Sequence, residues 1–202
     1  MKTAIIDYGM GNIASVQKAL DFLKIKNVIT SNHKEIIDSD FIILPGVGAF
    51  KQGMDNLIAY NLIPVLNEQV LVKQKPFMGF CLGMQLLAST GTEFVNCNGL
   101  GWIEGAVKRI IEPKKRIPHL GWNDISVTKP GFLSQVDQKN FYFIHSFHFD
   151  VSDKENVAAT VNYGKDYVAA IQNKNIFATQ FHPEKSQKSG LALLSAIFKY
   201  YA

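Results

Sequence analysis

The chain has 202 residues, of which 47% are hydrophobic and 19% charged, and its net charge is +4. These values are typical of an ordinary globular protein, and we expect residues 1–202 to form a single domain. Lys and Arg are scattered apart from the run 114–116, which argues against nucleic-acid binding. No run approaches the ~20 apolar residues of a membrane helix. The two cysteines suggest no disulfide framework, so we expect a protein of the reducing cytoplasm that binds neither nucleic acid nor membrane.

The first ninety residues alternate between short apolar runs and longer amphipathic segments. The runs predict buried strands at 4–6, 27–29, 41–44 and 76–80. Between the first two, residues 14–23 place Val16, Ala19, Leu20 and Leu23 on one face at helical spacing. Strands that alternate with helices predict right-handed βαβ units and a doubly wound parallel sheet.

The second half is richer in β-branched and aromatic residues and is punctuated by Gly, Pro and Asn. This pattern predicts strands within the stretches 99–110, 116–127, 141–151, 156–164, 167–172 and 176–181. An amphipathic helix over 189–201 follows. The expected fold class is therefore α/β, with a central mostly parallel sheet flanked by helices and a β-rich second half.

The most informative segment surrounds Cys81, which has Gly79 and Gly83 two residues to either side. A predicted strand runs directly into a predicted helix, so the segment has the form of a nucleophile elbow with Cys in place of Ser. A β-carbon on either glycine would clash in such a sharp turn. The helix N-terminus would favour the thiolate, the form that attacks carbonyl groups. The alternative is a buried structural cysteine with glycines nearby by coincidence.

A nucleophilic cysteine needs a base and a third group that orients the base. Of the five histidines, His182 follows a predicted strand, precedes Pro183 and has Glu184 two residues further on. Residues two apart in an extended segment point the same way, so Glu184 can reach the imidazole of His182. These residues predict a triad of Cys81, His182 and Glu184, although the sequence His-Pro-Glu alone would fit a surface loop equally well.

Acyl transfer also needs N–H donors for the oxyanion that develops on the carbonyl oxygen. The backbone N–H of Leu82, directly after the nucleophile, is one candidate. The turn Pro45–Gly48 after the third strand is a second candidate, because two glycines let a backbone approach a ligand closely. It lacks the Gly-Lys-Ser/Thr of a phosphate-binding loop, and it could equally be an ordinary turn.

These segments resemble the glutaminase subunits of imidazole glycerol phosphate synthase, members of the class I glutamine amidotransferase family. The resemblance runs along the whole chain through the motifs IIDYGMGN, LPGVGAF, GFCLGMQLL, GLGWIEG, PHLGWN, YFIHSF and ATQFHPEKSQ. It implies an amidotransferase fold and an enzyme that hydrolyses glutamine with Cys81 as nucleophile, His182 as base and Glu184 as its orienter. No cofactor and no metal are implied.

The resemblance also implies roles for individual positions. Val47 and Leu82 would supply the oxyanion amides. The positions that would hold glutamine are Gly48, Gln85, Ser146 and Phe147. The implied partner is a (β/α)₈-barrel synthase subunit that uses the ammonia to make imidazole glycerol phosphate and AICAR in histidine biosynthesis. The positions that would meet this partner in a heterodimer are Trp122, Asn123, Tyr142 and Lys185.

Three alternatives to the histidine pathway stay open. Ala14 stands where many members of the subfamily carry Arg, and paralogous glutaminases feed ammonia to surface-sugar amidotransferases. A cysteine peptidase on the same α/β frame would need a groove for an extended chain. A non-catalytic binding module would more readily have lost one of the triad residues, all of which are present.

Overall fold

The computed structural model describes residues 1–129 and 131–201. Strands and helices alternate through the first half, in the order β1 (Lys2–Ile6), α1 (Ile13–Phe22), β2 (Lys26–Thr30), α2 (His33–Ile37), β3 (Phe41–Gly46), α3 (Phe50–Ala59), α4 (Leu62–Asn67), the π-helix η1 (Glu68–Val72), β4 (Phe77–Cys81) and α5 (Leu82–Gln85). The four strands expected here are confirmed. No described helix has the length and apolar character needed to cross a bilayer.

Short strands dominate the second half, as expected. They are β5 (Thr90–Gly91), β6 (Cys97–Asn98), β7 (Gly105–Arg109), β8 (His119–Val127), β9 (Asn140–His145), β10 (Phe147–Val151), β11 (Val157–Asn162), β12 (Asp166–Asn173) and β13 (Ile176–Thr179). The 3₁₀ turns η2 (Ser134–Val136), η3 (Lys154–Asn156) and η4 (Pro183–Lys185) lie among them, and α6 (Gln187–Tyr200) follows. Most of the expected stretches were too long, because residues 99–104, 110, 116–118, 146, 156, 163–164 and 180–181 are not strand.

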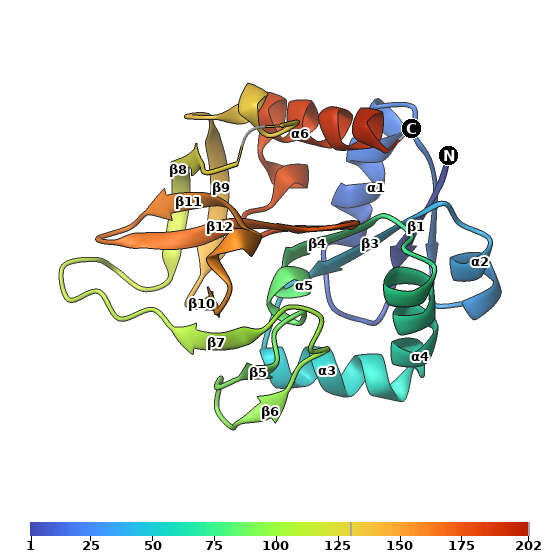
Figure 1. The fold of residues 1–202 in the computed structure, drawn as a ribbon, viewed down its shortest axis with the longest axis horizontal. Coiled ribbons are helices and arrows are strands. Elements are labelled where there is room, and N and C mark those ends of the chain that lie inside the picture. The colour runs from blue at the N-terminus through green and yellow to red at the C-terminus, as the bar shows by residue number, and fades with distance from the viewer. Residues whose placement is uncertain (130, 202) are drawn as a thin grey trace.

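A nine-stranded sheet organises the fold, in the order β2-β1-β3-β4-β13-β12-β11-β8-β9. The strand pairs from β2 to β13 are parallel, whereas the pairs from β13 to β9 are antiparallel. The parallel half contains the βαβ units predicted from the sequence, and the antiparallel half is the β-rich extension. A second sheet of order β10-β7-β5-β6 lies beside the first (Figure 1).

Helices cover both faces of the parallel half. Figure 1 shows α1 and α6 on one face and α3 and α4 on the other. Alternate residues of β1 divide between the two faces, since Ile5 packs with the first pair of helices and Ile6 with the second. Full burial of both faces explains why β1 and β3 appear in the sequence as continuous apolar runs.

Three neighbouring parallel strands bring distant parts of the sequence to one edge of the sheet. Gly46 at the end of β3 is in register with Cys81 at the end of β4. Phe80 of β4 is in register with Thr179, the last residue of β13. Ligand sites in open α/β sheets lie beyond the carboxyl ends of the strands. The segments that follow β3, β4 and β13 therefore meet where such a site is expected.

Candidate active site

Cys81 lies at a strained corner between β4 and α5. Its backbone has φ 51° and ψ −107°, a positive φ that non-glycine residues rarely adopt. Its side chain is only 6% exposed. Strain of this kind persists only where the surrounding structure enforces it. Here the backbone of β3 at Leu44 and the first turn of α5 lie directly against the turn that holds Cys81. The elbow predicted from the sequence is confirmed, although α5 has only four residues, so its dipole supports a thiolate less than a long helix would.

His182 and Glu184 form a buried pair beside this corner. The Nδ1–H of His182 donates to Oε1 of Glu184 over 2.8 Å, and both side chains are 2% exposed. This bond fixes the tautomer and leaves Nε2 as the second ring nitrogen. Nε2 makes no hydrogen bond within the described chain, and neither does Oε2 of Glu184. A buried carboxylate with one unbonded oxygen depends on the adjacent imidazole for compensation of its charge.

The charges around His182 favour its protonated form. Burial alone would lower the pKa of the imidazole, but the Cys81 sulfur and the Glu184 carboxylate outweigh burial and raise the pKa to about 10. The groups around the ring therefore favour the imidazolium at neutral pH. A thiolate beside an imidazolium is the activated form of a cysteine nucleophile.

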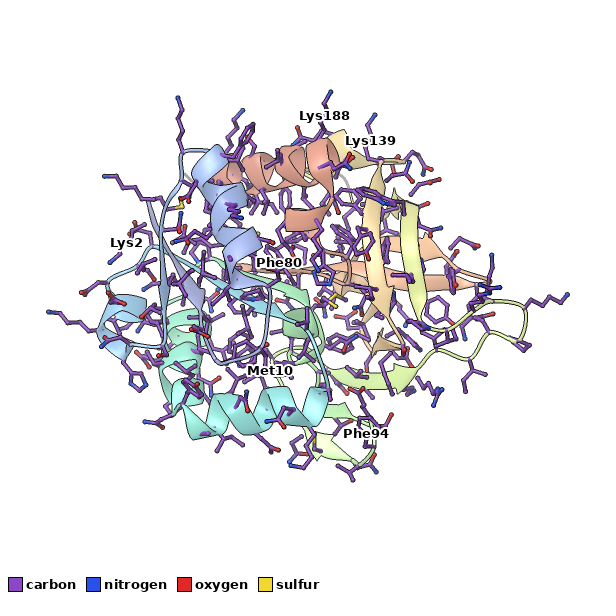
Figure 2. All side chains as sticks on the ribbon, turned by 180° about the vertical axis from the view of Figure 1, so that it is seen from behind. Lys2, Met10, Phe80, Phe94, Lys139 and Lys188 are labelled. Carbon is purple, nitrogen blue, oxygen red and sulfur yellow. The ribbon has the colours of Figure 1, made fainter. Side chains whose placement is uncertain are left out.

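A cavity of about 640 Å³ opens in front of the sulfur. The residues that line it come from the ends of β3, β4, β9 and β13, and they include Val47, Gly48, Cys81, Leu82, Gln85, Ser146, Phe147, His182 and Lys185. Gly48 has φ 111°, and a β-carbon there would meet Cε of Met10 at 2.7 Å. The turn after β3 thus needs glycine at this position. The loop residue Phe94 also lines the cavity, although it projects to the periphery in Figure 2 while Phe80 lies in the interior.

Comparison of the sequence with known proteins agrees with this geometry. Residues 4–199 match the family model described as "Glutamine amidotransferase class-I". The chain belongs to this family. It is 48% identical over 194 residues to "Imidazole glycerol phosphate synthase subunit HisH 1" of Campylobacter jejuni, covering 95% of this chain and 96% of that protein. It is 43% identical over 202 residues to the HisH subunit of Geobacter sulfurreducens, with 96% of each covered.

Solved structures of lower identity share the amidotransferase fold. A structure of PurLQS from Thermotoga maritima matches with a TM-score of 0.76 at 19% identity, over 100% of this chain and 99% of that one. A crystal structure described as a glutamine amidotransferase matches with a TM-score of 0.74 at 20% identity, over 96% and 98%. The expected fold class is therefore confirmed.

Within this amidotransferase, the three predicted triad residues lie together. The predicted oxyanion residues Val47 and Leu82 line the same cavity as the predicted glutamine-holding residues. Gln85 lies one turn along α5 from Cys81, as expected, and its Nε2 donates to the carbonyl oxygen of Phe147 over 3.0 Å. No group of three or more His, Cys, Asp or Glu suited to a metal ion occurs in residues 1–129 and 131–201.

The predicted partner-facing residues lie on the edge ribbon β8–β9 and on η4. Trp122 and Tyr142 are a cross-strand pair with ring centroids 5.9 Å apart, and Trp122 is 45% exposed. Leu120 and Ile144, also exposed and also paired, extend this apolar face toward the cavity. Asn123 instead faces His119, with 2.9 Å between its Oδ1 and Nε2 of the ring. Lys185 lines the cavity itself.

Sequence reasoning missed Gln180, which is fully buried between Gln85 and Cys81. The signal was present, because Gln180 precedes His182 by two residues just as Glu184 follows it by two. The alternation that pointed to Glu184 applies equally to Gln180. It also missed Ile144 on β9 and Pro118 just before β8, which line the cavity from positions distant in sequence from Cys81.

Proposed function

We propose that this chain is the glutaminase subunit of an imidazole glycerol phosphate synthase and that it hydrolyses glutamine with Cys81, His182 and Glu184. The observation that supports this best is the placement of Cys81 and His182 at one cavity, with His182 held by the buried carboxylate of Glu184. The relatives that are named as this subunit match along almost their whole length, which supports the pathway.

Acylation begins when the Cys81 thiolate attacks the side-chain carbonyl carbon of glutamine. The carbonyl oxygen becomes an oxyanion, which the backbone N–H groups of Val47 and Leu82 receive as donors. The C–N bond then breaks as Nε2 of His182 gives its proton to the departing nitrogen. The products of this half-reaction are ammonia and a γ-glutamyl thioester on Cys81. An imidazolium at neutral pH suits this step, because the leaving nitrogen needs a proton at once.

Deacylation uses the same groups in the opposite protonation state. Neutral His182 takes a proton from water through Nε2 while the water oxygen attacks the thioester carbonyl carbon. The C–S bond breaks, glutamate leaves, and the thiolate–imidazolium pair is restored. Glu184 keeps the ring oriented through both steps by accepting from Nδ1.

The ammonia passes, in this proposal, to a (β/α)₈-barrel synthase subunit docked on the face that holds Trp122 and Tyr142. The exposed apolar side chains of β8 and β9 support a docking role, since such a face beside an enzyme cavity is typical of a protein interface. Lys185, which lines the cavity, would meet the same partner. Asn123 points to the opposite face of β8, toward His119, so its predicted contact with the partner would need the edge of the strand. Docking there would cover the cavity and keep ammonia from escaping into water.

A surface-sugar amidotransferase is the alternative partner. Ala14, which departs from the subfamily pattern, is exposed on α1 and does not line the glutamine cavity. A change at this position therefore leaves the residues around the cavity as they are. We also propose that residues 1–202 act as one domain, because the nine-stranded sheet combines strands of both halves, and that the protein works in the cytoplasm, where its two free thiols would stay reduced.

The test is release of ammonia and glutamate from glutamine by the purified chain, alone and with each candidate synthase subunit. We expect hydrolysis that the imidazole glycerol phosphate synthase partner stimulates and that Cys81→Ala abolishes. Cys97→Ala, at the other free cysteine, should hydrolyse glutamine at the wild-type rate. Stimulation only by a sugar amidotransferase would support the alternative partner, and hydrolysis by Cys81→Ala would overturn the proposal.

A further inference from the structure

A chain of hydrogen bonds links the substrate-facing backbone to the nucleophile. The Nε2 of Gln85 donates to the carbonyl oxygen of Phe147 over 3.0 Å and to Oε1 of Gln180 over 3.0 Å. The Nε2 of Gln180 in turn donates to Sγ of Cys81 over 3.7 Å, within the range of a hydrogen bond to sulfur. Gln180 is wholly buried and Gln85 nearly so.

One backbone carbonyl dictates the orientation of both amides. The oxygen of Phe147 only accepts, so the atom of Gln85 that faces it must be the nitrogen. The second hydrogen of that nitrogen needs an acceptor, which sets the oxygen of Gln180 toward Gln85. The atom of Gln180 that faces Cys81 is then necessarily an N–H donor. Because both hydrogens of Gln85 are used, its remaining polar atom is an acceptor oxygen.

The main chain of Gln180 is also fixed. Its backbone N–H donates to the carbonyl oxygen of Ala169 on β12 over 2.8 Å, directly after the end of β13. The side chain is therefore held at its base by the sheet and at its tip by Gln85 and Cys81. A donor fixed in this way costs little reorganisation when charge develops on the atom that it faces.

The sulfur of Cys81 has two competing neighbours besides His182. The carbonyl oxygen of Ile144 lies 3.9 Å away and can accept only from the thiol form. The N–H of Gln180 favours the thiolate instead. His182 loses its proton during acylation, whereas an amide N–H does not titrate, so Gln180 still faces the sulfur as a donor when deacylation releases the thiolate.

We propose that Gln180 is a positioning residue that holds the Cys81 sulfur as a thiolate and fixes the Gln85 oxygen toward the bound substrate. This inference rests on the proposed function and deepens it. It predicts two effects of losing Gln180, a less reactive sulfur and weaker binding of glutamine, and different substitutions separate them.

The test compares Gln180→Glu and Gln180→Met with wild type, each in complex with the synthase subunit. Glutamate keeps an oxygen for Gln85 but turns a negative carboxylate oxygen toward the sulfur. Methionine has a similar length and neither donates nor accepts in this way. The control is Gln69→Glu, since Gln69 is a buried glutamine on η1, which precedes β4 and lies away from the cavity.

Alkylation of Cys81 by iodoacetamide at neutral pH, followed by mass spectrometry of the Cys81 peptide to exclude Cys97, reports the thiolate without requiring turnover. We expect alkylation to slow by about 10- to 100-fold in both Gln180 variants, the size of one hydrogen bond to a charged group. The value of kcat should fall in both, and KM should rise mainly in Gln180→Met. Gln69→Glu should match wild type in every measurement.

An unchanged alkylation rate and kcat in Gln180→Glu would overturn the inference while leaving an active wild type, and hence the proposed function, in place. An inactive wild-type complex would instead overturn the proposed function. Should the variants not fold, the side-chain amide resonance of Gln180 in the wild type decides. We expect it to shift when Cys81 is alkylated, and a resonance that does not respond would contradict the inference.

Discussion

The carbonyl oxygen of Leu44 on β3 occupies the space that a β-carbon on Gly83 would need. A β-carbon on Gly79 would lie 2.7 Å from the carbonyl oxygen of Gly83, so the backbone of Gly83 leaves no room for a side chain at Gly79. The expectation that neither glycine can carry a side chain is thereby confirmed. The close approach of β3 to the turn of α5 holds Cys81 in its strained conformation.

Gly83→Ala should therefore destabilise the fold as well as the site. The new methyl group overlaps backbone, which cannot rotate away as a side chain can, and overpacking of this kind costs about 3 kcal/mol. Urea denaturation of the purified chain measures the free energy of unfolding. Gly53→Ala on α3 is the control, because the nearest atoms there are flexible ends of Leu86 and Leu82 at 3.2–3.3 Å. Equal losses in the two variants would contradict this account of the elbow.

Glu184→Gln should slow glutamine hydrolysis by ~10²–10⁴-fold, because the imidazole keeps its place but loses a carboxylate that can only accept, and the amide can turn its N–H₂ toward Nδ1 and stabilise the wrong tautomer. Burial lowers the pKa of His182, whereas Cys81 and Glu184 raise it. Glu184→Gln removes the second of these two groups. The alkaline limb of the kcat/KM profile, where His182 loses its proton, should accordingly move to lower pH. Steady-state rates between pH 6 and 10 measure both effects. A slower enzyme with an unshifted profile would show that Glu184 acts only in packing.

The protonation of His182 also predicts how stability depends on pH. A folded pKa of about 10, above the ordinary value of 6.5, means that the folded state holds the proton more tightly than the unfolded state. The resulting stabilisation is fully present below pH 6.5 and is lost as pH rises through about 10. The difference in free energy of unfolding between wild type and His182→Gln should shrink over this window. In a Cys81→Ala background the folded pKa should be lower, so the loss should be complete at a lower pH. A difference that grows with pH would contradict the assignment.

Ser186 closes a ring of hydrogen bonds between the triad and the edge strand. Its hydroxyl donates to the carbonyl oxygen of His182 over 2.6 Å and accepts from the backbone N–H of Tyr142 over 3.0 Å. The N–H of His182 donates to the carbonyl oxygen of Tyr142 over 3.0 Å. The backbone of His182 is thus joined to the strand that supplies the proposed docking face.

Ser186→Ala should cost about 1–3 kcal/mol of stability, since it leaves buried backbone groups without their partner. It should also lower kcat in the complex more than it raises KM, because the hydroxyl holds His182 and does not line the glutamine cavity. Ser189→Ala, on the first turn of the same helix α6, is the control. An effect on KM alone would mean that the ring does not position His182.

Local sequence patterns predicted those parts of the site that depend on residues a few positions apart in the chain. The elbow follows from two glycines and a strand-to-helix change. The pairing of His182 with Glu184 was predicted from alternation in an extended segment, but Glu184 lies in the 3₁₀ turn η4, so the contact is present and the expected backbone conformation was wrong. The parallel strands β1 to β4 were equally visible, because each is a short apolar run between turn residues. These features depend on residues close together in the chain.

Long-range pairing was not predictable from the same patterns. The stretch 141–151 has one continuous strand pattern, yet β9 joins the large sheet and β10 the small one, with Ser146 between them. The bond between Gln85 and Gln180 joins residues 95 positions apart. Its existence depends on β13 lying next to β4, which no local period indicates. The β-rich second half was predicted, but the antiparallel pairing of its strands was not, for the same reason.

The central claim is that the sulfur of Cys81 attacks glutamine, and trapping the intermediate tests it most directly. Wild-type protein in complex with the synthase subunit is mixed with glutamine, quenched in acid during turnover, digested and analysed by mass spectrometry. The account predicts a γ-glutamyl group on the Cys81 peptide and none on the Cys97 peptide or in Cys81→Ala. Steady release of ammonia with no adduct on Cys81, or an adduct that persists in Cys81→Ala, would contradict it.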